Sequence, residues 1–412
     1  MCPRPTGTQA KLLFVLLVGA TACQSDEVAG PDAIGPRTEN VSAAAVFTFI
    51  HFRAGSYNTC LNRGPTYTLM CWGSNSDGTV GIGTTGGSVL SPRAISNTTG
   101  GQSWLGDVGL RHQCSLFLVT GGPKAYCWGA NYAGQLGTGN LTSRNTPTLV
   151  SGGIVWKQIS TGYHHTCGIS DIGVAYCWGR GSLGVLGNGG TADKLVPTPV
   201  NTGIAFASIH AGENFTCGRA QGTTVAAIYC WGNNSSGQLG IGTTTSQLLS
   251  PGPAVVGGAK WTDNLTLGSS HACALSSPLQ TYCWGYNGYG QVGVGSTASQ
   301  RSPIAVGVTV APVAAGGNHT CGRQTGTGKM YCWGRGDLGA LGNGFFINRL
   351  SPYPVLGDVV YSQDGSTLAA GANHTIAKRA DNVVVAWGYN NFGQVGDGTT
   401  NTRGAPVVIM TP

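Results

Sequence analysis

The residues best suited to chemistry in this chain of 412 residues are its 14 cysteines. Apart from Cys2 and Cys23, they fall into six close pairs with separations of 10 to 13 residues. Thiols in such pairs form disulfide bonds or, together with histidine, bind zinc. The pairs are Cys60 with Cys71, Cys114 with Cys127, Cys167 with Cys177, Cys217 with Cys230, Cys273 with Cys283, and Cys321 with Cys332.

Zinc is the main alternative to disulfides, because a histidine lies two residues before the first cysteine of four pairs. Three features oppose a metal site. No Cys-x-x-Cys motif occurs, and Asn58 and Phe215 replace the histidine beside intact pairs. His374 recurs where Ile376 and Ala386 replace both cysteines, and such joint loss is what a bonded pair requires. We therefore predict six disulfides, no metal and no cofactor.

No pattern of catalytic residues accompanies these cysteines. The chain has no Gly-x-Ser-x-Gly elbow, no phosphate-binding Walker loop and no His-Glu-x-x-His motif. Its 15 acidic residues recur at no fixed position, which argues against a carboxylate-rich active site. The net charge of +7 is thinly spread, without a run of Lys and Arg that would favour nucleic acid. We predict a protein that is not an enzyme and does not bind nucleic acid.

The elements that hold these residues form a repeat. Trp-Gly recurs seven times at spacings of 49 to 56 residues, and the fourth copy continues as WGNNSSGQLGIGTT. Each unit has four short apolar segments without helical periodicity, and paired glycines such as Gly137 and Gly139 permit unusual backbone angles and close packing. Four strands in each of seven units predict an all-β, seven-bladed β-propeller, with an open β-solenoid as the alternative. The Trp residues are Trp72, Trp128, Trp178, Trp231, Trp284, Trp333 and Trp387.

The phase of the repeat at the two ends favours a closed ring. The predicted propeller spans residues 46–412 and begins in the middle of a unit, at the apolar segment 46–50. It ends with the Pro-containing segment 405–409, which precedes such an apolar segment in other units. We therefore expect the C-terminal strand to complete the first blade and close the ring.

The repeated motifs resemble those of a known family. Gly-x-x-His-Thr, Trp-Gly-x-Asn and Gly-Gln-Leu-Gly-x-Gly are similar to the regulator of chromosome condensation repeat. The resemblance implies a seven-bladed propeller, and the chain is identified as an exported bacterial member with cysteine-paired repeats. The nuclear namesake exchanges guanine nucleotide on a small GTPase, a secreted bacterial relative inhibits β-lactamases, and others are scaffolds. The shared fold therefore does not specify one function.

Two recurring side chains are expected to hold the blades together. The Trp of each Trp-Gly pair should pack between blades, where its large apolar area is best buried. A histidine recurs at one repeat position, and we expect it to bond the backbone of the neighbouring blade instead of acting in catalysis. These histidines are His112, His165, His271, His319 and His374.

The N-terminal segment has the features of an export signal. Basic residues precede the apolar run 12–18, which is too short to span a bilayer. Ala20-Thr21-Ala22-Cys23 resembles a bacterial lipobox, although Ala replaces the usual first Leu. We predict a signal peptide over 1–22, a lipid anchor on Cys23 and a flexible tether over 23–45. The protein would then lie at the outer membrane or cell surface, or be secreted if Cys23 is not lipidated.

The positions that vary between repeats indicate a binding surface. Aromatic and Arg side chains on exposed loops are common anchors of protein interfaces. We therefore expect a monomer that acts as a protein-interaction module or scaffold at the cell envelope. The alternatives are a carbohydrate-binding or hydrolytic propeller and, by resemblance, a guanine-nucleotide exchange factor, which conflicts with export. The candidate binding residues are Tyr132, Arg180, Tyr286, Tyr289, Arg335, Phe345, Phe346, Tyr389 and Phe392.

Overall fold

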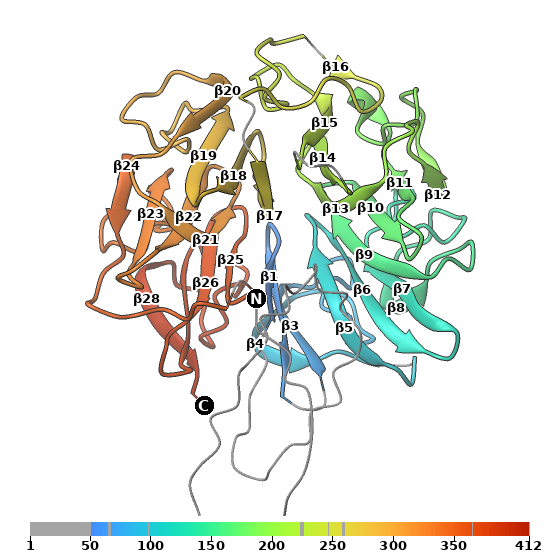
Figure 1. The fold of residues 1–412 in the computed structure, drawn as a ribbon. Helices are drawn as coiled ribbons and strands as arrows, with labels where there is room; N and C mark the ends of the chain where they lie inside the picture. Colours follow the sequence, from blue (N-terminus) through green and yellow to red (C-terminus); the bar gives the residue numbers. More distant parts are fainter. Residues whose placement is uncertain are drawn as a thin grey trace, which may run out of the picture. The chain divides into compact units, whose positions relative to one another are not determined.

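Seven small antiparallel sheets surround a central channel in the computed structural model of the protein (Figure 1). The structure describes residues 51–64, 67–97, 99–222, 226–245, 247–257, 260–364 and 366–411, without the side chains of Trp104 and Leu105. The predicted signal peptide, the anchor at Cys23 and the tether lie outside the described residues. Within those residues, no helix has the length and apolar character needed to cross a bilayer.

Each sheet, or blade, uses four strands that are consecutive in the chain and hydrogen-bonded in chain order. The first strand of each blade lines the channel, and the fourth lies at the periphery. Blade 1 contains β1 (His51–Ala54), β2 (Asn58–Arg63), β3 (Thr68–Ser74) and β4 (Ser88–Ala94). Blade 2 contains β5 (Gln102–Val108), β6 (His112–Val119), β7 (Gly122–Gly129) and β8 (Arg144–Leu149). Blade 3 contains β9 (Trp156–Thr161), β10 (His165–Ser170), β11 (Ala175–Gly179) and β12 (Lys194–Pro199), with the 3-10 turn η1 (Ser182–Gly184) between the last two.

The other four blades repeat this order. Blade 4 contains β13 (Phe206–Ala211), β14 (Phe215–Ala220), β15 (Ile228–Asn233) and the short β16 (Gln247–Leu248). Blade 5 contains β17 (Lys260–Leu267), β18 (His271–Ser277), β19 (Gln280–Gly285) and β20 (Gln300–Ala305). Blade 6 contains β21 (Val310–Ala315), β22 (His319–Gln324), β23 (Met330–Gly334) and β24 (Arg349–Pro354). Blade 7 contains β25 (Leu368–Ala370), β26 (His374–Lys378), β27 (Val384–Gly388) and β28 (Arg403–Met410). The described residues thus form the predicted all-β, seven-bladed propeller.

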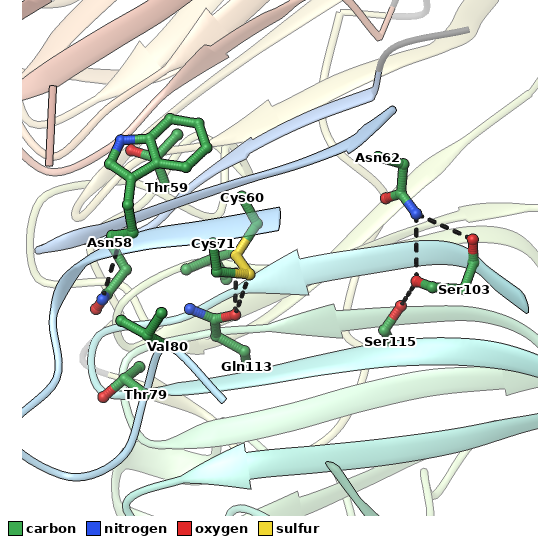
Figure 2. Close-up of a disulfide and its surroundings, with 12 residues drawn as sticks. Asn58, Thr59, Cys60, Asn62, Cys71, Thr79, Val80, Ser103, Gln113 and Ser115 are labelled. Atoms are coloured by element: carbon green, nitrogen blue, oxygen red, sulfur yellow. Dashed lines mark hydrogen bonds between the residues drawn. A yellow bond between two sulfur atoms is a disulfide. The ribbon is translucent and has the colours of Figure 1, made fainter. Parts of the chain in front are cut away.

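Six disulfides join the second and third strands of blades 1 to 6, and Figure 2 shows the first of them. They are the six pairs predicted from the sequence. The two cysteines of each pair face each other in register, with Cα atoms 4.1–4.2 Å apart. The bonds join Cys60 to Cys71, Cys114 to Cys127, Cys167 to Cys177, Cys217 to Cys230, Cys273 to Cys283, and Cys321 to Cys332.

The last blade has no such cross-link at the same position. In blade 7, Ile376 faces Ala386 where the other blades have their cysteines, and both residues are buried. An apolar pair therefore replaces the disulfide, as the joint loss of both cysteines in the sequence indicated.

The core of the propeller lies between the blades. Each Trp of a Trp-Gly pair is fully buried, and its Nε1 donates a hydrogen bond to a backbone carbonyl of the preceding blade, as Trp178 does to Gln135 at 3.0 Å. This confirms the predicted packing of Trp between blades. Gly137, two residues after Gln135, has φ +68°, and a Cβ there would lie 2.6 Å from Trp178 Nε1. Both the backbone angle and the close approach of the indole therefore require glycine.

The ring closes through contacts between blades 1 and 7. The expectation that the C-terminal strand completes the first blade is wrong, because β28 pairs with β27 as the fourth strand of blade 7. The chain enters blade 1 at its innermost strand and leaves blade 7 at its outermost strand, so every blade is built from one contiguous segment. Phe52, Leu61 and Trp72 of blade 1 pack against Ile376 and Val395 of blade 7. Side-chain packing and hydrogen bonds between the two blades, such as that from Trp72 Nε1 to the carbonyl of Gln394, close the ring without a shared sheet.

Candidate functional site

The long loops between the third and fourth strands, here called the WG loops, all leave one end of the propeller. Consecutive strands of a blade are antiparallel, so the turns between first and second strands lie at the same end. We call this end the loop face and those short connections the inner turns. The WG loops span residues 75–87, 130–143, 180–193, 234–245, 286–299, 335–348 and 389–402.

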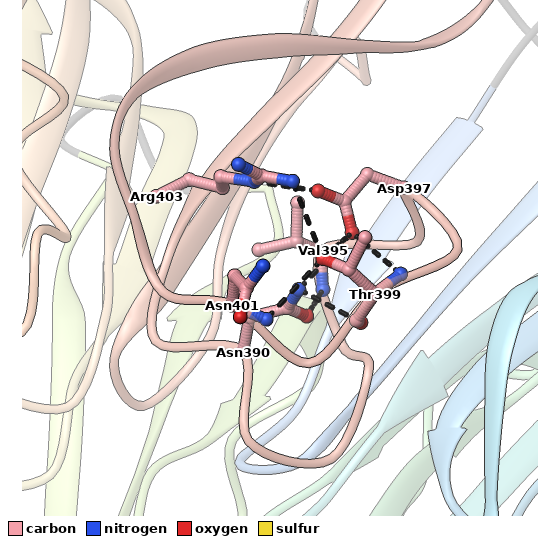
Figure 3. A network of polar contacts seen from close by, with 6 residues as sticks. All are labelled: Asn390, Val395, Asp397, Thr399, Asn401 and Arg403. Atoms are coloured by element: carbon pink, nitrogen blue, oxygen red, sulfur yellow. Dashed lines mark hydrogen bonds and ion pairs between the residues drawn. The ribbon is translucent and has the colours of Figure 1, made fainter.

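An asparagine at the start of the WG loop fixes its conformation in five blades. In blade 7, Asn390 Oδ1 accepts a bond from the amide of Val395 at 2.8 Å, and its Nδ2 donates to the carbonyl of Thr399 at 3.0 Å (Figure 3). Asp397 adds bonds to Thr399 and Arg403. One buried amide therefore links the two halves of the loop. The equivalent residues are Asn75, Asn131, Asn234 and Asn287.

Blades 3 and 6 hold their WG loops in a different way. Gly181 and Gly336 stand at the asparagine position, and a side chain from the far end of the loop bonds their amides. Asp193 accepts from the Gly181 amide at 2.9 Å, and Asn348 accepts from that of Gly336 at 3.0 Å. All seven loops thus have a side chain that bonds across them, because Asn75 of blade 1 acts in the same way as the asparagine of blade 7.

All nine candidate binding residues lie on WG loops. Three aromatic rings are about half exposed: Tyr132 at 49%, Phe345 at 53% and Phe346 at 52%. The structure brings seven of the nine into three clusters on neighbouring blades. Arg180 is exposed, whereas the others are partly buried, namely Tyr286, Tyr289, Arg335, Tyr389 and Phe392.

The first cluster joins the WG loops of blades 2 and 3 to an inner turn. The hydroxyl of Tyr132 lies 2.8 Å from Nδ1 of His164, and the neighbouring Tyr163 belongs to the same turn. Burial, together with the nearby Arg180 and Arg111, lowers the pKa of His164 to about 4. The imidazole is therefore neutral at pH 7, and the charged groups of this cluster are Arg180 and the ion pair of Arg111 with Asp77, 3.3 Å apart.

The second cluster joins the WG loops of blades 5 and 6. The guanidinium of Arg335 lies over the ring of Tyr289, 5.3 Å from its centroid, and also pairs with Asp337 at 2.7 Å. The rings of Tyr286 and Tyr289 meet edge to face with centroids 6.2 Å apart. Three of the five predicted residues on these two loops therefore form one contact group.

The third cluster spans the closure of the ring. Tyr389 and Phe392 of blade 7 lie with ring centroids 6.3 Å apart, and Phe392 packs on Tyr57 of blade 1 at 5.0 Å. Phe345 and Phe346 lie outside the three clusters. Phe345 has the guanidinium of Arg349, from the outer strand β24, over its ring at 5.7 Å.

The sequence interpretation missed the contribution of the inner turns. Tyr57, Arg111, Tyr163 and His164 all come from these turns and take part in or border the clusters. The signal was present in the sequence, because the residues between Gly and His-Thr vary between repeats. Their place inside a recurring motif favours a structural role and hides this variation.

The recurring histidines are structural, but their partner differs from the prediction. Each bonds a threonine hydroxyl of the next blade, not the backbone, at 2.7–3.0 Å. His319 Nε2 donates to Thr375 Oγ1, because that hydroxyl itself donates to the carbonyl of Ala340. Within the described ranges, no three His, Cys, Asp or Glu residues are grouped to hold a metal ion.

Burial also determines the charge of these histidines. It lowers the pKa of His319 to about 4, and all five are therefore neutral at pH 7. The other four have a pKa lowered to about 3, namely His112, His165, His271 and His374.

Comparisons with known proteins identify the repeat. The profile of the "Regulator of chromosome condensation (RCC1) repeat" matches residues 124–169, 173–218, 227–275, 280–322 and 327–377. The Arabidopsis thaliana protein "Ultraviolet-B receptor UVR8" is 30% identical over 351 residues, which cover 84% of this chain and 66% of the receptor. The human "Probable E3 ubiquitin-protein ligase HERC6" is 30% identical over 194 residues, or 44% of this chain and 18% of the ligase.

Solved structures share the fold at lower sequence identity. Prp20p from Saccharomyces cerevisiae has a TM-score of 0.71 at 20% identity, with 88% of each chain covered. Human WBSCR16 has a TM-score of 0.68 at 18% identity, with 80% of this chain and 86% of that chain covered. With five matches to the repeat profile and seven blades of the same build, the chain belongs to the regulator of chromosome condensation repeat family.

Proposed function

We propose that this protein is a non-enzymatic propeller that binds a protein partner through its loop face. The observation that carries the proposal is the set of three clusters in which aromatic and Arg side chains from neighbouring blades meet. Their loops are held by bonds across each loop, so little conformational entropy is lost when a partner binds. Aromatic and Arg side chains are also the residue types most enriched among interface hot spots.

Relatives support a partner that is itself a protein. The structure of Prp20p is reported with its binding properties to Gsp1p and histones, and another contains yeast RCC1 (Prp20) bound to Kap60. The partner of the present chain is a separate question, because these structural relatives are at most 20% identical. We propose no ligase activity, since this chain covers only 18% of HERC6.

We further propose that the protein acts outside the cytoplasm, at the cell envelope. Six disulfides support this, because such bonds persist in oxidising compartments and are rare in the cytosol. The same argument disfavours nucleotide exchange on a cytoplasmic GTPase. Cys23 would carry the lipid anchor, and a Cys23→Ser variant should lose labelling by a radioactive fatty acid and leave the membrane fraction. If the variant is labelled like the natural chain, the anchor assignment is wrong.

The binding surface is tested by cross-linking the purified protein in cell-envelope extract and identifying captured proteins by mass spectrometry. The Tyr286→Ala/Tyr289→Ala variant should lose the specific partner while its melting temperature stays within about 4 °C of the natural chain. The matched control is Ile172→Ala/Leu279→Ala, which removes exposed apolar side chains, 80% and 59% exposed, from turns at the opposite end. Equal loss of the partner in both variants, or undiminished capture by the tyrosine variant, would contradict the assignment of the loop face as the binding surface.

A further inference from the structure

The central channel is asymmetric along its length. At the end where the first strands begin, it encloses about 560 Å³, which is within the range of small-molecule sites. Towards the loop face, a separate cavity lined by the inner turns holds only about 80 Å³. There the hydroxyl of Tyr163 reaches across to Ser269, 3.2 Å away and two blades further round the ring. A small molecule would therefore have room only in the wide part, away from the loop face.

Seven equivalent positions form one ring of side chains along the wall of the wide part. Where the side chain carries a carboxylate or hydroxyl oxygen, that oxygen accepts a bond from a backbone amide of the next blade. Asp107 accepts from Thr161 N at 2.9 Å, and Ser160 accepts from Ala211 N at 3.1 Å. Thr266 does the same to the amide of Ala315 at 3.0 Å. The members of the ring are Arg53, Asp107, Ser160, His210, Thr266, Ala314 and Ala369.

Amide side chains of two first strands also bond backbone groups of the next blade. Gln158 makes paired bonds to the amide and carbonyl of Ile209, at 3.0 and 2.8 Å. Asn264 Oδ1 accepts from Val313 N at 3.4 Å. The first strands of neighbouring blades are not paired in a sheet, so these side chains satisfy backbone groups that would otherwise lack partners. The oxygen acceptors of the wall are therefore largely occupied by the protein itself.

Some cationic and donor groups of the channel wall have no partner in the described ranges of the chain and could bind a ligand. Lys157 is exposed in the channel wall and has no ion-pair or hydrogen-bond partner among the described residues. Arg53 uses Nε and one terminal nitrogen on the carbonyls of Gly106 and Phe52, which leaves its second terminal nitrogen without a described partner. His210 Nε2 is also unpartnered within the described part of the chain. Burial and the nearby Arg53 lower the pKa of His210 to about 4, so its imidazole is neutral at pH 7, and Nε2 is a donor in the tautomer that carries the proton there.

The two acidic side chains of the wall, Asp107 and Asp263, already have partners within the protein. Asp107 accepts bonds from Ser160, Thr161 N and Val108 N. Burial raises the pKa of its carboxyl group above the usual value, although the nearby Arg53 acts in the opposite direction. Asp263 is paired with the guanidinium of Arg219. Most oxygen acceptors of the wall are thus engaged by the protein, although Thr161 Oγ1 has no partner among the described residues. The Lys157 ammonium group and one Arg53 nitrogen have no described partner, an arrangement suited to an anion.

We propose that the wide part of the channel binds a small molecule that carries a carboxylate or phosphate group, with Arg53 and Lys157 as its charged contacts and His210 beside it. A carboxylate and a phosphate present the same oxyanion chemistry to a guanidinium and an ammonium group. This site is separate from the loop face and does not depend on the protein partner proposed above.

The test is a calorimetric titration of the protein with citrate, pyrophosphate and the neutral sugar cellobiose at matched ionic strength. We expect saturable binding of citrate or pyrophosphate, and whichever binds identifies the carboxylate or the phosphate source. Arg53→Gln and Lys157→Gln should each weaken that binding at least about tenfold. The matched control is Arg93→Gln, which removes one positive charge from β4, the outer strand of the blade that contains Arg53. This variant should leave binding unchanged.

A second readout locates the bound anion. The imidazole resonances of His210, assigned by their loss in His210→Gln, should shift on titration with the anion that binds. Saturable heat from neither anion, binding of cellobiose alone, or equal weakening by Arg93→Gln would overturn the proposal. If Arg53→Gln fails to fold, Lys157→Gln still decides, because the exposed Lys157 makes no described contact that the fold requires.

Discussion

His319 and Thr375 illustrate how single residues join neighbouring blades. The histidine bonds the hydroxyl at 3.0 Å, and the hydroxyl bonds the carbonyl of Ala340 at 3.2 Å. Where the histidine is replaced by Phe215, the threonine of the next blade is replaced by Ala272. The chain therefore either has both partners or lacks both, as expected for a buried pair in which one partner alone would be unsatisfied.

This pairing predicts a strong coupling between the two positions. Thr375→Ala leaves His319 with a buried donor unsatisfied, so it should lower the free energy of unfolding by about 1–3 kcal/mol. His319→Phe/Thr375→Ala copies the natural pair of Phe215 and Ala272 and should cost clearly less than the sum of the two single variants. A double-mutant cycle on unfolding free energies measures the coupling. Additive losses would show that the pair does not act as a unit.

The same histidines predict how stability depends on pH. Burial lowers their pKa in the folded state to about 3 or 4, whereas an unfolded histidine has a pKa near 6.5. Their contribution to stability is therefore fully present above about pH 6.5 and is lost as the pH falls towards 3, because only the unfolded state binds the protons. The melting temperature should decrease over this interval. The melting temperature of the His319→Phe/Thr375→Ala variant should decrease less steeply as the pH falls. An unchanged slope would show that carboxylates, and not this histidine, cause the dependence on pH.

At the scale of elements, the disulfide hairpin of each blade can be compared with the last blade, which has none. In blade 5, replacing Cys273 by Ile and Cys283 by Ala copies the pair of Ile376 and Ala386, so this variant should fold while losing about 2–3 kcal/mol for the missing cross-link. Replacing both cysteines by Ser should cost more, because it adds two buried hydroxyl groups. Thermal unfolding with and without a reductant measures both. A greater loss in the apolar variant would mean that blade 5 cannot accommodate the packing of blade 7.

The WG loops are the elements on which the proposed interface depends. Asn287→Ala removes the bonds from this side chain to the Val292 amide and to the carbonyls of Ser296 and Ala298. We expect faster amide hydrogen exchange over residues 286–299 and weaker partner capture, with the tyrosines themselves unchanged. Asn97→Ala, on an exposed turn, is the control. If capture persists while exchange accelerates, rigidity of the loop is not part of recognition.

At the scale of the whole molecule, the repeat made the fold predictable. Recurrence of Trp, Gly and His-Thr, together with the paired cysteines, was enough for seven blades and for all six disulfides. The route of ring closure was not predictable, because the order of segments 405–409 and 46–50 along the repeat does not show which blade each of them joins. The pairing of β28 with β27 determines the route of closure, since β28 follows β27 after a WG loop as every fourth strand follows its third.

The binding surface was only partly predictable for a related reason. Variable positions indicated the nine WG-loop residues, but their grouping depends on which blades are neighbours. The contact of Phe392 with Tyr57 joins residues at opposite ends of the chain. Likewise, the channel wall brings Arg53, Asp107 and Ser160 together from three separate blades, and no local pattern marks them.

The most direct test of the loop face is amide hydrogen exchange of the protein alone and in complex with its captured partner. The proposal predicts protection of the inner turns at Tyr57 and His164 and of the WG loops, especially 130–143, 286–299, 335–348 and 389–402. The turns around Ile172 and Leu279, at the opposite end, should exchange at the same rate in both states. Protection confined to that opposite end, or to the outer strands, would contradict the assignment of the loop face as the binding surface.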